Sequence, residues 1–427
     1  MDKLFKLQQL GTDVKTEMMA GVTTFFTMIY MIVVNPAILA TAGVPFEVVF
    51  IATIISTVIG TLLMAFWANL PVVVAPAMGL NVYFVNLVIV EEVSFETVFG
   101  AVLIASVLFL LLSLTNYRQI ITDAIPDTLK YSVTAGIGFF IAMLGLTMSG
   151  IIVPSSETMV TFGDVGEPTT LLTIVGLLIT IVLIVRQDKG AIFIGMLITG
   201  LIGYLTGLFE IDKVVSLPSK PEIIDFDLKG VFSNSLFMTI LAFLLIAIIN
   251  SSGTMSLLNQ STGVGRSRPG RKLNATHIAD SLASTAGALF GSTPATNYIE
   301  SSTGMQAGGR SGLTALVVAG LTLLTIFFFP LAEAVSMLVS ITAPALIIIG
   351  SYMFFAIARI SWYDFAEAFP AFLVIVTIPL TANIATGMAI GFIVHPLIQL
   401  AQGNGRYVHP IMYALAIIFL LHMIFAR

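Results

Sequence analysis

The sequence predicts an all-α polytopic membrane protein with 14 transmembrane segments, arranged as a 7+7 inverted repeat in which the third and tenth segments are broken half-helices. Three observations predict this fold. Of the 427 residues, 57% are hydrophobic and only 10% are charged, whereas a typical soluble domain carries roughly 25% charged residues. Apolar stretches long enough to cross a bilayer recur along the chain. Two of these stretches are interrupted by Pro and Gly at matching places.

The composition also limits the function. It excludes an ordinary cytosolic enzyme, a disordered chain and a nucleic-acid binder. The absence of cysteine excludes disulfides, thiolate metal sites and cysteine nucleophiles. The sequence shows no metal-ligand spacing and no Ser/His/Asp arrangement with supporting context, so we expect no enzyme activity, no metal and no cofactor.

Twelve uninterrupted apolar stretches are long enough to cross a bilayer. They lie near 19–40, 47–67, 96–114, 127–150, 168–186, 190–208, 236–259, 273–290, 312–330, 338–358, 366–382 and 383–401. The interrupted segments, near 72–90 and 292–308, bring the number to 14. Residues 1–18 are expected to form an N-terminal interfacial segment. An apolar tail near 409–425 could span the bilayer or lie in the interface.

The basic residues predict the orientation, because Lys and Arg concentrate in cytoplasmic loops. With the N-terminus inside and both interrupted segments counted as crossings, inner loops receive 14 of the 18 basic residues, namely Lys3, Lys6, Lys15, Arg118, Lys130, Arg186, Lys189, Arg266, Arg268, Arg271, Lys272, Arg310, Arg359 and Arg406. The outer segment 209–234 holds three Lys together with five acids. We therefore expect a multi-pass protein of the cell membrane with a cytoplasmic N-terminus.

The two interrupted segments indicate an internal repeat. Each follows two long spans and precedes one long span and then three more. Seven crossings in 19–208 and seven in 235–402 are joined by an extracellular linker, 209–234, and followed by a C-terminal apolar helix in 403–427. An odd number of crossings in each half gives the halves opposite orientations, so the repeat must be inverted.

The interrupted segments, 74–81 and 292–300, are also the predicted ligand site. Pro removes a backbone donor and disfavours helix before itself, so each segment should contain a short extended stretch that leads into a half-helix. Such backbone is tolerated at membrane depth only where it is buried in protein or lines a cavity. A half-helix N-terminus then offers N–H groups to a polar ligand. Pro and Gly could instead merely kink a packing helix, but two matching positions favour a site.

Glu300 is the strongest candidate for chemistry. An acid at membrane depth costs several kcal/mol and is functional by default. It could accept a hydrogen bond from a ligand N–H or carry a proton, or its carboxylate could cap the half-helix. Thr296 and Asn297, in the same segment, are further candidates for substrate binding.

Polar residues on other segments are weaker candidates. The amide of Asn81 suits a heterocycle edge but could equally join two helices. Asn250 begins a run of small and polar residues, 250–254, that is either a close-packing face or a wall of the site. Thr27 and Tyr30 lie on one helical face of the first span and are ambiguous in the same way.

Several motifs resemble the AzgA-like purine permeases of the nucleobase:cation symporter-2 superfamily. They run in order over nearly the whole chain: Gly21-Val22-Thr23-Thr24-Phe25, Val34-Asn35-Pro36-Ala37-Ile38-Leu39, Ala75-Pro76-Ala77-Met78-Gly79-Leu80-Asn81, Tyr298-Ile299-Glu300-Ser301-Ser302-Thr303-Gly304, Ala307-Gly308-Gly309-Arg310-Ser311-Gly312-Leu313-Thr314 and Phe369-Pro370-Ala371-Phe372.

The resemblance implies a core domain of spans 1–4 and 8–11 and a gate domain of spans 5–7 and 12–14, which is commonly the dimer surface. It implies uptake of hypoxanthine, guanine or adenine with protons, by an elevator-like motion of core against gate. Substrate would lie between the broken segments, with Glu300 as the essential acid and Asn81 as the polar residue of the third segment.

The eighth span departs from this family pattern. Ala247 and Asn250 stand where permeases of this group usually carry acids. Asn250 keeps hydrogen-bonding capacity but cannot titrate. The alternatives that stay open are coupling through Glu300 alone, another small heterocycle, a facilitator without proton coupling, an anion transporter or channel of the same fold, and a membrane sensor.

Overall fold

The computed structural model describes residues 2–115, 117–211, 213–218, 220–233, 236–262 and 271–425. Within these residues, nine helices are long and apolar enough to cross a membrane, and four shorter apolar helices accompany them. The prediction of a polytopic, mainly helical membrane protein is confirmed. Arg266 and Arg268, two residues of the predicted inner loops, lie outside the described residues.

The first half of the chain contains the predicted spans in order. Its elements are α1 (Asp2–Phe5), η1 (Gln8–Leu10), α2 (Val14–Met28), α3 (Tyr30–Ala40), α4 (Phe46–Leu63), π-helical η2 (Met64–Ala68), β1 (Val74–Pro76), α5 (Met78–Ile89), α6 (Phe95–Ser113), α7 (Tyr117–Ala124), α8 (Asp127–Met148), β2 (Ile152–Ser155), β3 (Met159–Phe162), α9 (Pro168–Val185) and α10 (Ala191–Leu205). Helix starts follow local capping chemistry. The Asp13 side chain accepts a 3.0 Å hydrogen bond from the Thr16 N–H at the start of α2.

The second half follows the same order of long and broken elements. Its elements are α11 (Leu228–Ser233), α12 (Phe237–Thr262), α13 (Arg271–Phe290), β4 (Ala295–Asn297), α14 (Ser301–Gln306), α15 (Gly312–Leu324), η3 (Thr325–Phe328), α16 (Phe329–Met337), α17 (Val339–Phe354), η4 (Phe355–Arg359), α18 (Phe365–Thr381), α19 (Ile384–Ala401), η5 (Gly405–Tyr407) and α20 (Pro410–Phe425). Helix α20, the predicted apolar tail, packs against α19.

The two interrupted segments meet as a pair of short strands. Strands β1 and β4 are antiparallel, with Ala75 opposite Thr296. The Ala77 N–H donates to the Pro294 carbonyl at 3.0 Å, and the Tyr298 N–H donates to the Val73 carbonyl at 2.9 Å. All six strand residues are buried. The extended stretches predicted before each half-helix are therefore present, and pairing satisfies backbone groups that lipid could not.

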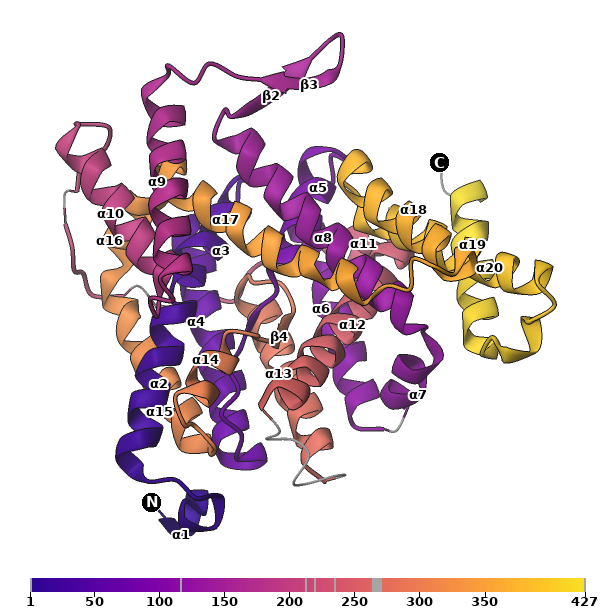
Figure 1. The fold of residues 1–427 in the computed structure, drawn as a ribbon, viewed down its shortest axis with the longest axis horizontal. Helices are drawn as coiled ribbons and strands as arrows, with labels where there is room; N and C mark the ends of the chain where they lie inside the picture. The colour runs from indigo at the N-terminus through magenta and orange to yellow at the C-terminus, as the bar shows by residue number, and fades with distance from the viewer. Residues whose placement is uncertain are drawn as a thin grey trace.

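The helices pack as two groups (Figure 1). Neighbouring helices of the first group, α2–α6 and α12–α15, contact one another, and α4, α12 and α13 contact the β1–β4 pair. In the second group, α8, α17, α9, α10, α18 and α19 pack together, and α8 lies against α17 over most of its length. The short helix α7 connects α6 of the first group to α8 of the second.

The structure adds four details to the sequence-based expectation. The chain is not purely helical, because β1–β4 and the β2–β3 hairpin are strand pairs. The predicted linker contains α11. The eleventh span continues through η3 and α16 to Met337. At the N-terminus, Phe5 and Leu7 are buried against Leu313.

Candidate functional site

A cavity of about 690 Å³ lies beside the antiparallel β1–β4 pair. Its wall combines both helix groups: β4 and α12 from the first, α8 and α17 from the second. At one end it reaches Asp123, Asp127, Lys130 and Arg359. Asp123 and Arg359 are exposed, and the Asp127 side chain is 75% exposed, so the cavity opens at this end.

Glu300 lies in this cavity, at the first turn after β4. The Tyr30 hydroxyl, from the first span, donates a 2.5 Å hydrogen bond to Glu300 Oε1. The Glu300 side chain makes no capping hydrogen bond to α14. The alternative role considered for this residue was a carboxylate that only caps the half-helix, and Glu300 does not have this role in the structure. The carboxylate is held toward the first span and the cavity.

Thr296 and Asn297 also line the cavity, as does the polar segment of α12. Asn250, Ser252, Gly253 and Thr254 all contribute to the wall. Of the two interpretations of this segment, a packing face and a site wall, the structure places four of its five residues at the wall. Together with Glu300 these side chains offer amide and hydroxyl donors and acceptors to a small polar ligand.

Two predicted binding residues do not line the cavity. Asn81 is fully buried and belongs to a polar cluster between helices: it donates to Asn35 Oδ1 and accepts from the Thr293 hydroxyl. Asn35 in turn donates to Thr53 Oγ1 at 2.6 Å. Asn81 therefore makes, through Asn35 of α3, the helix–helix hydrogen bond that the sequence left as its alternative role.

Thr27 lies beside the half-helix but outside the cavity wall. Its hydroxyl shares a 3.0 Å hydrogen bond with the Thr303 hydroxyl of α14 and donates to the Thr24 carbonyl at 2.8 Å. The residue three positions later on the same helical face, Tyr30, is the one that reaches the cavity. Thr27 thus links α2 to α14, and its hydroxyl already has partners within the protein.

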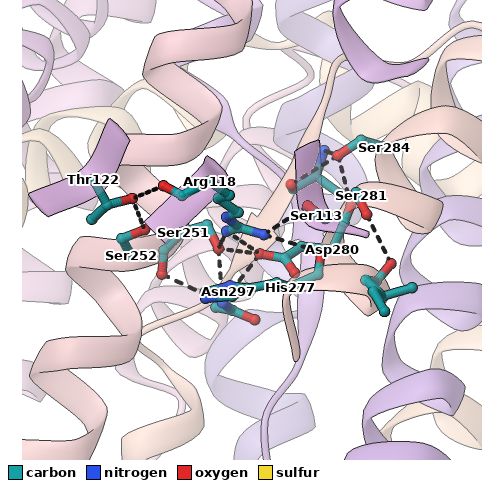
Figure 2. Close-up of polar contacts among 12 residues, drawn as sticks. Ser113, Arg118, Thr122, Ser251, Ser252, His277, Asp280, Ser281, Ser284 and Asn297 are labelled. Carbon is teal, nitrogen blue, oxygen red and sulfur yellow. Dashed lines mark hydrogen bonds and ion pairs between the residues drawn. The ribbon is translucent and has the colours of Figure 1, made fainter. Parts of the chain in front are cut away.

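Sequence reasoning missed a buried ion pair next to the cavity (Figure 2). Arg118, assigned to an inner loop, is 1% exposed, and Asp280 on α13 is fully buried. Arg118 Nη2 lies 3.3 Å from Asp280 Oδ2. The available signal was Asp280 itself, an acid with a neighbouring His277 inside a predicted span, because intramembrane charges are usually paired.

Metal binding has no support in the described part of the chain, where no group of three or more His, Cys, Asp or Glu side chains could hold an ion. The fold and the cavity instead define a class: a polytopic helical membrane protein with a ligand-sized cavity, partly lined by polar side chains, where two interrupted segments meet.

The chain belongs to a permease family. Residues 15–390 match the family described as "Permease family". The chain is 45% identical to the guanine/hypoxanthine permease PbuO of Bacillus subtilis (strain 168), with 98% of this chain and 99% of that protein covered. It is 38% identical to the guanine/hypoxanthine permease PbuG of the same organism, with both chains covered completely. The predicted resemblance is confirmed, as is the prediction of a transporter and not an enzyme.

A solved structure shows the same fold. The transmembrane domain of a cyanobacterium bicarbonate transporter, BicA, superposes with a TM-score of 0.66 over 87% of this chain and 96% of that chain. The sequence identity is 18%, so this likeness concerns the fold alone.

Proposed function

We propose that this protein imports purine nucleobases, namely hypoxanthine, guanine or adenine, together with protons. The observation that carries the proposal is the Glu300 carboxylate. It lies just after β4, held by Tyr30 in a cavity that both helix groups line. A nucleobase presents N–H donors and carbonyl or ring-nitrogen acceptors in one plane. Glu300 can accept from such an N–H, while Asn250 and Asn297 offer amides and Thr296 offers a hydroxyl. The names of the two relatives support this substrate class.

The proposed mechanism is an elevator-like motion. The first helix group corresponds to the proposed core, formed by spans 1–4 and 8–11 of a 7+7 inverted repeat. The second corresponds to the proposed gate, formed by spans 5–7 and 12–14. The antiparallel β1–β4 pair, one strand from each half, supports the inverted repeat. Because the cavity wall combines both groups, sliding one against the other would carry a bound ligand between the two sides of the membrane.

We further propose that the N-terminus is cytoplasmic in the cell membrane and that two copies pair through the outer face of the gate. The orientation rests on the distribution of basic residues. With this orientation the cavity opens inward, because Lys130 and Arg359 at its mouth belong to predicted inner loops.

Proton coupling is assigned to Glu300. The eighth-span positions of the usual acids hold Ala247, which is buried, and Asn250, which lines the cavity without a titratable group. Glu300 is thus the carboxylate beside the β1–β4 pair that can exchange a proton with the contents of the cavity. The mechanism that we test is therefore proton coupling through one acid, Glu300.

Uptake into proteoliposomes tests the proposal. The purified protein should take up labelled hypoxanthine, guanine or adenine saturably, and an imposed inward proton gradient should accelerate uptake until a protonophore is added. Uracil is the matched control heterocycle. No saturable uptake of any nucleobase would refute the substrate class. Flux that follows anion identity would favour an anion transporter, and uptake indifferent to the proton gradient would favour a facilitator.

A further inference from the structure

Arg118 occupies an unusual place for a connector residue. It lies on the eight-residue helix α7, which joins the two helix groups, yet its side chain is buried among α6, α12 and α13. Its guanidinium carbon lies 4.5 Å from the centre of the Phe109 ring. A buried guanidinium is costly unless its hydrogen bonds are matched, so its partners define what it does.

The guanidinium donates on two sides. Nη1 donates to Ser113 Oγ at 3.1 Å and to the His277 carbonyl at 3.0 Å. Nη2 donates to Ser251 Oγ at 2.7 Å and to Asp280 Oδ2 at 3.3 Å. The Ser251 hydroxyl itself donates to Asp280 Oδ2. One planar group thereby fixes both Ser251 and Asp280, which the point charge of a lysine could not do.

These two residues reach the cavity through Asn297. The Asn297 Nδ2 group lies 3.2 Å from Ser251 Oγ and 3.5 Å from Asp280 Oδ2 (Figure 2). The opposite orientation of this amide would place its oxygen against a carboxylate, so the surroundings determine that the NH2 end meets Asp280. The amide oxygen, Asn297 Oδ1, is a buried acceptor that has no partner among the described residues.

We propose that Arg118 is a positioning residue of the transport site: through Ser251 and Asp280 it fixes the Asn297 amide so that the site offers the ligand a hydrogen-bond acceptor there. The matching ligand group is an N–H donor. This inference rests on the proposed nucleobase transport, and it adds a residue outside the cavity to the determinants of ligand choice.

A purely structural ion pair would leave different consequences. Breaking a buried pair strands a charge and lowers stability, whereas neutralising both partners restores most of it. The position of the Asn297 amide does not depend on whether the two charges are balanced. It needs the acceptor oxygens of residues 251 and 280 held in place, and without Arg118 both lose the donor that they share.

The test measures uptake and melting temperature for three variants in the intact protein. Arg118→Lys keeps the positive charge but loses the planar guanidinium that donates to Ser251 and Asp280 together. Arg118→Met leaves Asp280 without its cation. The double variant Arg118→Met/Asp280→Asn removes both charges. Arg186→Gln is the matched control, since Arg186 forms an exposed pair with Asp188 whose side chains are 73% and 40% accessible.

We expect Arg118→Lys and the double variant to raise the KM for hypoxanthine severalfold, up to about tenfold, the scale of a lost hydrogen bond between neutral groups. The double variant should melt near the wild-type temperature. Both variants should also discriminate less between hypoxanthine and its N-methylated derivatives, which lack one N–H donor. The Arg186→Gln variant should keep wild-type values.

A wild-type KM and wild-type discrimination in Arg118→Lys, or in the double variant, would overturn the inference while leaving nucleobase transport intact. Should Arg118→Met not fold, the other two variants still decide the question. The absence of nucleobase uptake by the wild-type protein is a distinct result, because it refutes the proposed function itself.

Discussion

The Tyr30 hydroxyl donates a 2.5 Å hydrogen bond to Glu300, and this contact joins the first span to the segment that follows β4. The two residues are 270 positions apart in the chain, and both line the cavity. The carboxylate therefore has a fixed orientation before any ligand arrives. Such preorganisation reduces the free energy that ligand binding must spend on ordering the site.

Tyr30→Phe should weaken nucleobase binding. The change removes one hydroxyl and leaves the ring in place, so Glu300 loses the donor that orients it. A hydrogen bond to a charged group contributes about 1.5–3 kcal/mol, which corresponds to a rise in KM of about tenfold or more. The concentration dependence of uptake into proteoliposomes measures this rise in KM. Tyr204→Phe, on the exposed face of α10, is the control. An unchanged KM in Tyr30→Phe would mean that Glu300 needs no such orientation.

Glu300→Gln should abolish proton-driven uptake. The glutamine keeps the size and one acceptor oxygen but cannot exchange a proton. We expect residual, gradient-independent flux of bound nucleobase at most, measured as uptake with and without an imposed pH difference. Glu157→Gln, exposed between β2 and β3, should behave as wild type. If uptake and its pH dependence survive in Glu300→Gln, the proton is carried elsewhere.

The sequence predicted the main architecture because hydrophobic length and the Pro-containing breaks are local signals. Pro76 and Pro294 indicated extended backbone inside two spans, and β1 and β4 lie there. Local signals do not specify partners far along the chain. That Ala75 pairs with Thr296 depends on how the two halves pack.

The same limit explains the errors at the site. Loop counting placed Arg118 on the membrane surface, because its partner Asp280 is 162 residues away. Helical spacing placed Thr27 and Tyr30 on one face but could not say how that face is rotated toward the cavity. Glu17 was likewise missed: its carboxylate accepts from the N–H groups of Arg310 and Ser311 at 2.8 and 3.1 Å.

Asn81→Ala should affect stability more than ligand affinity. Asn81 is hydrogen-bonded to Asn35 and Thr293 and lies outside the cavity wall. Removing it leaves those partners unsatisfied, at a cost of about 1–3 kcal/mol each. We expect a lower melting temperature with a KM within about twofold of wild type, since hydrogen bonds to the ligand are kept. Asn404→Ala, whose side chain makes no capping bond, is the control. A large rise in KM at an unchanged melting temperature would instead place Asn81 in contact with the ligand.

Glu91 should make the stability of this conformation depend on pH. It follows α5, outside the spans, and burial raises the pKa of its carboxyl, opposed by a hydrogen bond from Asn383. A raised folded-state pKa means that the folded protein binds more protons, so stability falls as the pH rises from the ordinary value through the raised one. Melting temperatures across this window should decline for wild type. Glu91→Gln, which stays neutral, should lack this decline; identical slopes would exclude Glu91 as the cause.

The contact between Glu91 and Asn383 also joins the two helix groups at the end away from the cavity mouth. Asn383 Nδ2 donates to Glu91 Oε1 at 2.8 Å. The mouth residue Arg359 precedes the 17-residue α18, and Asn383 follows it, so roughly 25 Å of helix separates them. Opening the protein at the Asn383 end requires this hydrogen bond to break. Asn383→Asp should break it by placing two carboxylates together, while the aspartate still caps α19 through Thr386.

A shift away from the present conformation can then be read by cysteine labelling, because the chain has no cysteine of its own. A cysteine at Ser252, in the cavity wall, should react more slowly with a membrane-impermeant maleimide applied from the mouth side when Asn383→Asp is present. Adding Glu91→Gln should restore the labelling rate, since the glutamine amide can donate to Asp at 383 and so rebuild the contact with reversed roles. If Asn383→Asp leaves the rate unchanged, the hydrogen bond contributes nothing to the balance between the two conformations.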